Sequence, residues 1–192
     1  EILRCLVGSE MCIRDSFNVV FIALGSAISI IVGQQLGAGK LEEAVDTDRK
    51  MIVFSVFCCF VIGACMFAIA PFFPRIYNTT EEVRGLAKQF IRIASACMPL
   101  YGFMHATYFT LRSGGRTVIT FLFDSVYIWV VDIPLAFVLT RFTGVPIVSI
   151  YLSCQLIEII KCIIGYVMVK KKIWVNNMVM DCLLYTSPSP RD

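Results

Sequence analysis

Three acidic residues stand inside long apolar runs, where charged side chains are rare. Asp124 and Asp132 share one run, and Glu158 lies in the next. An ionisable side chain inside a membrane is costly to keep there, so it marks an ion or substrate pathway unless a partner neutralises it. Asp124 and Asp132 are eight residues apart, which places them about 80° apart on one broad face of a helix. We predict that these carboxylates bind a cation and release it on protonation.

Each acid also has an interpretation as half of a structural ion pair. Asp124 follows a basic turn, so Arg112 or Arg116 is a possible partner if Asp124 lies near the end of its helix. Glu158 precedes Lys161 by three residues, a spacing that puts two side chains on one helix face. For Glu158 and Lys161 we favour the ion pair, whereas for Asp124 both interpretations stay open.

The remaining polar candidates are a histidine and several aromatic rings. Asp132 lies deeper in its run than Asp124, and it reaches either the outer water or Arg141. His105, the single histidine, is able to relay protons or to form a hydrogen bond between helices. Aromatic faces attract organic cations, although packing is the interpretation we favour for each ring alone: Tyr101, Tyr108, Tyr127 and Trp129. The candidate ion-coupling or cargo residues are therefore Asp124, Asp132, His105, Glu158 and Tyr127.

The composition of the chain indicates a membrane protein. Of its 192 residues, 58% are hydrophobic and 16% are charged, whereas soluble domains average about 25% charged residues. The net charge of +3 is small, and the basic residues lie in turns rather than in a patch for nucleic acid. The expected partner is therefore a lipid bilayer. Because a span needs about 20 apolar residues, the sequence predicts an all-α, polytopic transmembrane helix bundle with about five spans, at residues 17–36, 51–73, 93–111, 118–140 and 147–169.

Basic residues mark one side of the predicted bundle. Three basic turns fall on the same side, at Gly37–Lys50, Arg112–Arg116 and Lys170–Lys172. The other side carries the Arg75–Lys88 region and Arg141. Because positive residues favour the cytoplasmic side, we predict a multi-pass protein of the cell inner (plasma) membrane with a cytoplasmic C-terminus.

The first predicted span carries small residues at every fourth position. Gly25, Ser29, Gly33 and Gly37 stack on one helical face. Small residues at this spacing let two helix backbones approach closely inside a membrane, where packing drives association. The sequence therefore predicts that this face packs against another helix.

Both ends of the chain match translations of a synthetic DNA sequence. Met11–Ser16 and Cys182–Ser187 correspond to the translation of opposite strands of one sequencing-adaptor oligonucleotide. We therefore interpret residues 1–16 as mostly adaptor-derived, from about residue 5 onward, and residues 182–192 as adaptor-derived. The transmembrane lobe is then residues 17–177, and the chain is expected to be an internal fragment of a longer reading frame.

Four segments resemble one family of transporters in the same order along the chain. These are VGQQLGAGKLEEA after the small-residue helix, LRSGGRT at Leu111–Thr117, WVVDIPLA at Trp129–Ala136, and the basic-aromatic end at Lys170–Trp174. Together they are similar to the multidrug and toxic compound extrusion (MATE) transporters, over nearly all of residues 17–177.

The resemblance implies a fold and an activity. MATE proteins have twelve helices in two lobes of six, and they exchange Na⁺ or H⁺ for organic cations and other drugs by alternating access. The order of spans here resembles a C-terminal lobe without its first helix, so the expected partners are the missing N-terminal lobe and a small organic cation or drug. No cofactor is expected beyond the coupling ion.

Two alternatives are weighed against this reading. A lipid or polysaccharide flippase of the same broad superfamily would need more lysine and arginine in its cavity for anionic headgroups. A membrane-embedded enzyme would need clustered catalytic groups such as HExxH, whereas the chain has one histidine. The six cysteines between the two ends form no CxxC pair, so we expect no metal site.

Overall fold

The chain folds into helices that follow its apolar runs. The computed structural model describes residues 2–72, 80–142, 144 and 146–175, with side chains from residue 18 onward. The described residues form no strand, and the predicted all-α bundle is confirmed. The helices are α1 (Ile2–Gly37), α2 (Leu41–Ile69), α3 (Glu81–Ser113), α4 (Thr117–Phe121), η2 (Leu122–Val126), η3 (Ile128–Asp132), α5 (Ile133–Phe142) and α6 (Ile147–Lys170). α4 to α5 form one helical segment, Thr117–Phe142, here called the fourth segment.

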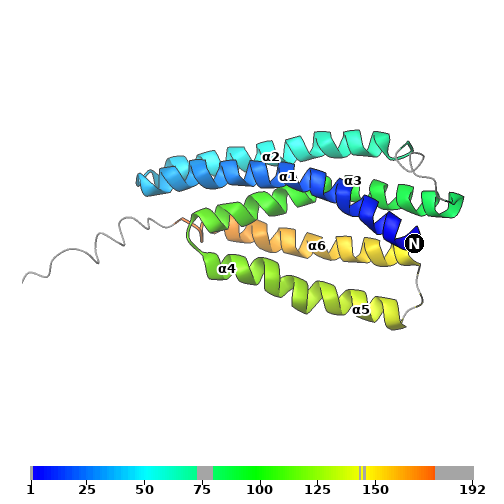
Figure 1. Ribbon diagram of the computed structural model, residues 1–192. Coiled ribbons are helices and arrows are strands. Elements are labelled where there is room, and N and C mark those ends of the chain that lie inside the picture. The colour runs from blue at the N-terminus through cyan, green and yellow to red at the C-terminus, as the bar shows by residue number, and fades with distance from the viewer. Residues whose placement is uncertain (1, 73–79, 143, 145, 176–192) are drawn as a thin grey trace, which may run out of the picture.

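Four parts of the described chain are long and apolar enough to cross a membrane: Asn18–Gly37 of α1, α2, the fourth segment and α6. The predicted span at residues 93–111 lies in the remaining long helix, α3. α3 contacts α1, α2 and α6, and Figure 1 shows it between α1 and α2 on one side and α6 with the fourth segment on the other. Neighbouring helices therefore cover the less apolar surface of α3.

α2 begins earlier than the sequence indicated. The predicted span starts at residue 51, but the helix starts at Leu41, so most of the Gly37–Lys50 loop is helical. Glu42 and Glu43 lie in its first turn, where negative charge offsets the positive end of the helix dipole. The true turn is short, and Gly39 enables it with a φ of 76°, which glycine adopts without steric cost.

Glycine brings α2 and α3 close together at the proline of α3. Pro99 lies inside α3 and has no N–H, so the carbonyl of Ser95, four residues earlier, lacks its helical donor. A Cβ added at Gly63 of α2 would lie 2.7 Å from that carbonyl oxygen. One helical turn further along α3, a Cβ at Gly102 would lie 2.6 Å from Cys59 Sγ. The two backbones therefore approach too closely for a larger residue at either glycine.

The small-residue face of α1 is only partly a packing face. Gly25 packs as predicted, since a Cβ there would lie 2.0 Å from the Phe109 ring of α3. At Gly33 nothing lies within 4 Å of an added Cβ, Ser29 is half-buried, and Gly37 is exposed at the helix end. The prediction is therefore wrong for Gly33 and Gly37 within this bundle. Larger residues on an adjacent stripe form the buried face instead: Phe21, Ile28, Val32 and Leu36.

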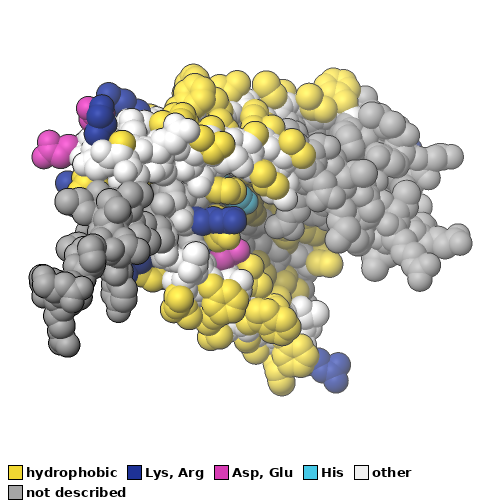
Figure 2. All heavy atoms as spheres, turned by 60° about the vertical axis from the view of Figure 1, so that its left-hand side comes forward, with side chains coloured by type: hydrophobic (Ala, Val, Ile, Leu, Met, Phe, Trp, Pro, Cys, Tyr) yellow, Lys and Arg dark blue, Asp and Glu magenta, His cyan; other side chains and the backbone are white. Residues whose placement is uncertain are grey.

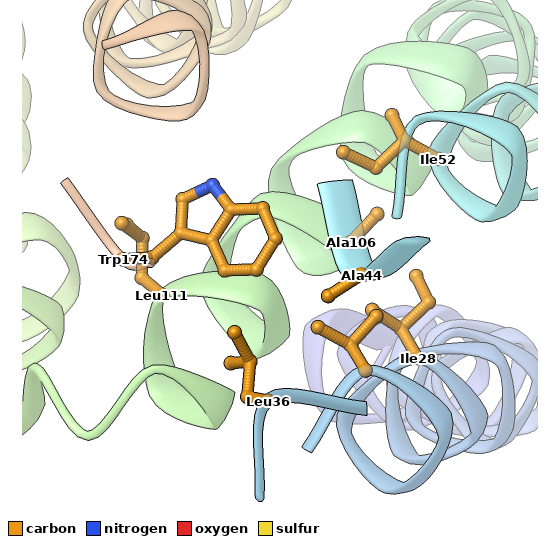
Figure 3. Close-up of a cluster of buried hydrophobic side chains, with 8 residues drawn as sticks. Ile28, Leu36, Ala44, Ile52, Ala106, Leu111 and Trp174 are labelled. Atoms are coloured by element: carbon orange, nitrogen blue, oxygen red, sulfur yellow. The ribbon is translucent and has the colours of Figure 1, made fainter. Parts of the chain in front are cut away.

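One end of the bundle closes around Trp174. This side chain is fully buried in a cluster with residues of α1, α2 and α3, shown in Figure 3: Ile28, Leu36, Ala44, Ile52, Ala106 and Leu111. Nearby, Arg116 Nε donates a hydrogen bond to the carbonyl oxygen of Ile173 over 3.3 Å. The three predicted basic turns therefore meet at one end, as the sequence indicated. The Trp174 ring fills the gap between these helix ends.

The adaptor interpretation stays a prediction. α1 includes residues 5–16, although their side chains are not described. Residues 182–192, and the last residues of the predicted 17–177 lobe, lie outside the described part of the chain.

Candidate functional site

The fourth segment departs from α-helical geometry where its acids lie. Asp124 is in the π-helical turn η2 and Asp132 is in the π-helical turn η3. π-Helical turns are rare and occur frequently at functional sites. Nothing in the residue pattern predicted them, so the local geometry of both aspartates was missed at the sequence level.

Asp124 forms an ion pair with Lys161 of α6. Lys161 Nζ lies 2.9 Å from Asp124 Oδ1, and the exposed fraction is 4% for the lysine side chain but 47% for the aspartate side chain. The favoured pairing of Lys161 with Glu158 is therefore wrong, and so is the pairing of Asp124 with Arg112 or Arg116. Lys161 reaches across to the neighbouring helix because α6 packs beside the fourth segment there.

Aromatic rings surround the Lys161 ammonium. Its Nζ lies 5.4 Å from the centre of the Phe123 ring and 5.6 Å from that of Tyr127, distances at which a cation is attracted to a ring face. The Tyr127 hydroxyl donates a hydrogen bond of 2.9 Å to the carbonyl oxygen of Ile157, which fixes the ring against α6. Tyr127, chosen from the sequence as a candidate, is thus part of this site.

The other two acids face each other. The side chains of Asp132 and Glu158 lie close together, and Lys161 acts electrostatically on both. Asp132 Oδ1 and Glu158 Oε2 are buried and have no hydrogen-bond partner. An ionised carboxylate only accepts hydrogen bonds, so a hydrogen bond between these two carboxyl groups would require one proton on the pair. Of the two alternatives predicted for Asp132, the contact with Arg141 is not among the ion pairs of the described residues, and Glu158 lies beside Asp132 instead.

A cavity of about 280 Å³ opens beside the ion pair. It lies between α1, α3, the fourth segment and α6, and is lined by Asn18, Ile22, Met104, His105, Tyr108, Phe109, Phe123, Asp124 and Lys161. Figure 2 shows basic, acidic and histidine side chains gathered in a hollow with hydrophobic side chains around it. The cavity therefore combines a half-exposed carboxylate with aromatic walls.

His105 is held from two sides. Its ring stacks on Phe21 at 5.0 Å between centres, with 19° between planes. Its Nδ1 lies 3.0 Å from the carbonyl oxygen of Tyr101. The Tyr101 hydroxyl in turn donates a hydrogen bond to Gln155 Oε1. The hydrogen bond to Tyr101 lies within α3 and the ring stack reaches α1, so the predicted hydrogen bond between helices stays a prediction. His105 also lines the cavity.

The structure separates the aromatic candidates. Tyr108 lines the cavity, Tyr127 contacts Lys161, and Trp129 is 71% exposed on the outside of the fourth segment. Asn18 lines the cavity and Gln155 accepts the Tyr101 hydrogen bond, and neither was predicted from the sequence. Both are polar residues in or beside apolar runs, the one signal that could have identified them.

The described arrangement can do two things chemically. The Asp124 carboxylate and its ring neighbours can hold an organic cation, and the Asp132–Glu158 pair can hold and release a proton. The two sites share one lysine, so the charge on one affects the other.

Comparison with known proteins identifies one family. The MatE family model matches residues 7–138. No solved structure matches the chain significantly.

Two curated bacterial proteins are similar to part of the chain. "Probable multidrug resistance protein YoeA" of Bacillus subtilis (strain 168) is 23% identical over 136 residues, which is 69% of this chain and 28% of that protein. "Probable multidrug resistance protein NorM" of Oceanobacillus iheyensis is 25% identical over 130 residues, which is 64% of this chain and 28% of that protein. The matched region thus spans little more than a quarter of either relative.

Proposed function

Because the chain belongs to the MatE family, we propose that it is part of a multidrug efflux antiporter that exchanges Na⁺ or H⁺ for organic cations or drugs by alternating access. The observation that carries this proposal is the half-exposed Asp124 carboxylate on a cavity with aromatic walls. A carboxylate supplies the charge for a cationic drug, and the rings supply broad contact that tolerates different cargo shapes. The Asp132–Glu158 pair supplies the coupling-ion site.

The rest of the transporter is part of the proposal. A second lobe of the same polypeptide, preceding this one, would complete the alternating-access unit. We place the protein in the plasma membrane with the basic end, where Arg116 meets Ile173, in the cytoplasm. This orientation follows from the excess of positive residues in the three turns that meet there.

The cavity chemistry favours cationic cargo over anionic lipid. Among the described lining residues, Lys161 is the one Lys or Arg side chain, and Asp124 neutralises it. An anionic headgroup would meet no free positive charge from these lining residues, so we do not favour a flippase. Because the chain belongs to the MatE family, we propose transport rather than enzymatic turnover.

Ion-driven efflux tests the proposal. The full-length reading frame that contains this chain would be reconstituted in vesicles, and ethidium efflux would be followed by fluorescence under an imposed H⁺ or Na⁺ gradient. We expect gradient-dependent efflux, with loss of most of it in the Asp132→Asn/Glu158→Gln double variant. Lys170→Gln, an exposed position on α6, is the matched control. Efflux that ignores both gradients, or that survives the double variant unchanged, would contradict the proposal.

A further inference from the structure

Lys161 contacts the carboxylate proposed to hold the cargo and acts electrostatically on the acid pair. We infer that its ammonium is a tethered cation that occupies the cargo position at Asp124 and moves to Glu158 when the Asp132–Glu158 pair loses its proton. This inference rests on the proposed function and adds a mechanism by which proton and cargo exclude each other.

Lys161 already makes the contacts that a cationic cargo needs. Its ammonium lies 2.9 Å from the Asp124 carboxylate and faces the rings of Phe123 and Tyr127. The cavity beside it is bordered by Asp124 and further aromatic rings. A cargo cation that enters must therefore compete with Lys161 for one carboxylate.

A second acceptor for the ammonium is present on the same helix. Glu158 lies three residues before Lys161, and its Oε2 is buried without a partner. Lysine carries its charge on a flexible four-carbon stem, so the ammonium is able to change partner without movement of α6. Lys161 acts electrostatically on both Asp132 and Glu158.

Loss of the shared proton drives the change of partner. Two adjacent carboxylates without a proton repel each other, and a buried charge is costly unless a partner neutralises it. The Lys161 ammonium relieves that repulsion when it moves to Glu158, and Asp124 is then free for cargo. When the proton returns to the acid pair, the Lys161 ammonium moves back to Asp124 and displaces the cargo. Proton binding and cargo release are then coupled, as exchange requires. In this mechanism, the ion pair of Lys161 with Asp124 corresponds to the proton-bound, cargo-excluded arrangement.

Other titratable groups face this lysine and must be separated from it. The fourth segment contributes Asp124, Tyr127 and Asp132, and α6 itself contributes Glu158. α3 contributes His105, which lines the same cavity, and α6 also places Cys154 and Cys162 near the acids. His105 is the group that titrates near neutral pH in its ordinary state, so it needs its own control.

Equilibrium binding of ethidium tests the inference directly. The 192-residue chain in phosphatidylcholine nanodiscs would be titrated with ethidium between about pH 5 and about pH 8, a range that spans carboxyl and histidine titration. We expect wild type to bind more tightly as pH rises. Lys161→Gln should bind about tenfold more tightly at the low-pH end, equivalent to one charge interaction of about 1.4 kcal/mol, and should lose most of the pH dependence.

Further variants separate competition from other causes. Glu158→Gln removes the alternative acceptor, so we expect weak binding at every pH. Lys161→Arg keeps a cation at Asp124 and should keep the block. His105→Gln should retain the pH dependence, and Lys170→Gln should behave as wild type because its charge lies at the exposed end of α6. Size-exclusion profiles would show that each variant is folded.

Three outcomes would overturn the inference. The first is weaker ethidium binding by Lys161→Gln than by wild type. The second is a pH dependence of binding in Lys161→Gln that equals that of wild type. The third is the absence of ethidium binding by both chains at every pH. The proposed function is tested separately by ion-driven efflux. Ethidium binding that follows the predicted pattern, without ion-driven efflux, would support the role of Lys161 and contradict transport.

Discussion

The two halves of the bundle are built differently. The half formed by α1, α2 and α3 is closely packed at Gly25, Gly63 and Gly102, and it contains the Trp174 cluster. In the half formed by the fourth segment and α6, the described span windows are 6% and 17% buried, against 28% in both α1 and α2. That second half holds the ion pair, the acid pair and two π-helical turns. The contrast indicates a rigid scaffold beside a more loosely held helix pair that carries the chemistry.

Polar groups follow the same division. In the scaffold, Asp48 is 1% exposed, and its Oδ1 accepts a hydrogen bond of 2.6 Å from the Thr110 hydroxyl. That contact ties the start of α2 to the end of α3. In the helix pair, Asp124 is half-exposed and its cationic partner is a flexible lysine. The Asp48 carboxylate is fixed in place, whereas the Asp124 carboxylate is the one that we infer to exchange partners.

The two tryptophans provide the largest expected difference. Trp174→Ala should lower the free energy of unfolding by about 3–5 kcal/mol, as truncation of a fully buried aromatic side chain does. Trp129→Ala should change it by less than about 0.5 kcal/mol, because that residue lies on an exposed surface. Unfolding by denaturant in mixed micelles measures both. Equal effects would show that the end cluster is not part of a rigid scaffold.

Glycine-to-alanine changes test the close helix approach. Gly63→Ala should destabilise the chain by about 1–3 kcal/mol, since its Cβ would overlap the Ser95 carbonyl oxygen and overpacking costs that much. Gly33→Ala should stabilise it by up to about 1 kcal/mol, because alanine is the better helix former and the site is open. The same unfolding assay applies. Stabilisation by Gly63→Ala would contradict the close packing of α2 on α3.

The buried hydrogen bond gives a smaller effect. Thr110→Val removes the donor to Asp48 while keeping the side-chain shape, so we expect a loss of about 1.5 kcal/mol in unfolding free energy. The control is Asp46→Asn, which breaks an exposed ion pair with Lys50 and should cost less than about 0.5 kcal/mol. An equal loss of unfolding free energy in Asp46→Asn and Thr110→Val would show that the buried Asp48–Thr110 hydrogen bond contributes no more to stability than an exposed ion pair.

The smallest stability effect is expected in the helix pair. Replacing both members of its ion pair, in Asp124→Asn/Lys161→Met, should change unfolding free energy by less than about 1 kcal/mol, since Asp124 is half-exposed and the double change leaves neither member as an unpaired charge. Ethidium binding should nevertheless fall to background, because the carboxylate is gone. Unfolding and ethidium binding measured on the same preparation show whether the ion pair contributes to stability or to binding. A large loss of stability would mean that the pair is structural.

The apolar runs were sufficient to predict the helices and the grouping of the basic turns. The early start of α2 was missed, because Asp46, Asp48 and Lys50 lie on helical turns that hydropathy alone assigns to a loop. Asp124, Asp132 and Glu158 were found because charge is rare in such runs.

The pairing of these acids could not be predicted. Which acid contacts Lys161 depends on how α6 sits against the fourth segment, a long-range register that no local spacing encodes. The burial of Trp174 was missed for the same reason, since three distant helix ends create its pocket.

The π-helical turns have a mechanical consequence. A π-helical turn contains one residue more between bonded groups than an α-helical turn, and the fourth segment has two such turns, at Leu122–Val126 and Ile128–Asp132. Each extra residue can migrate or be absorbed by exchange of backbone partners, and each such step rotates the helix beyond it by about 100°. Loss of the π-helical turn at Leu122–Val126 would therefore turn Asp132 about the helix axis while the backbone of the segment stays hydrogen-bonded.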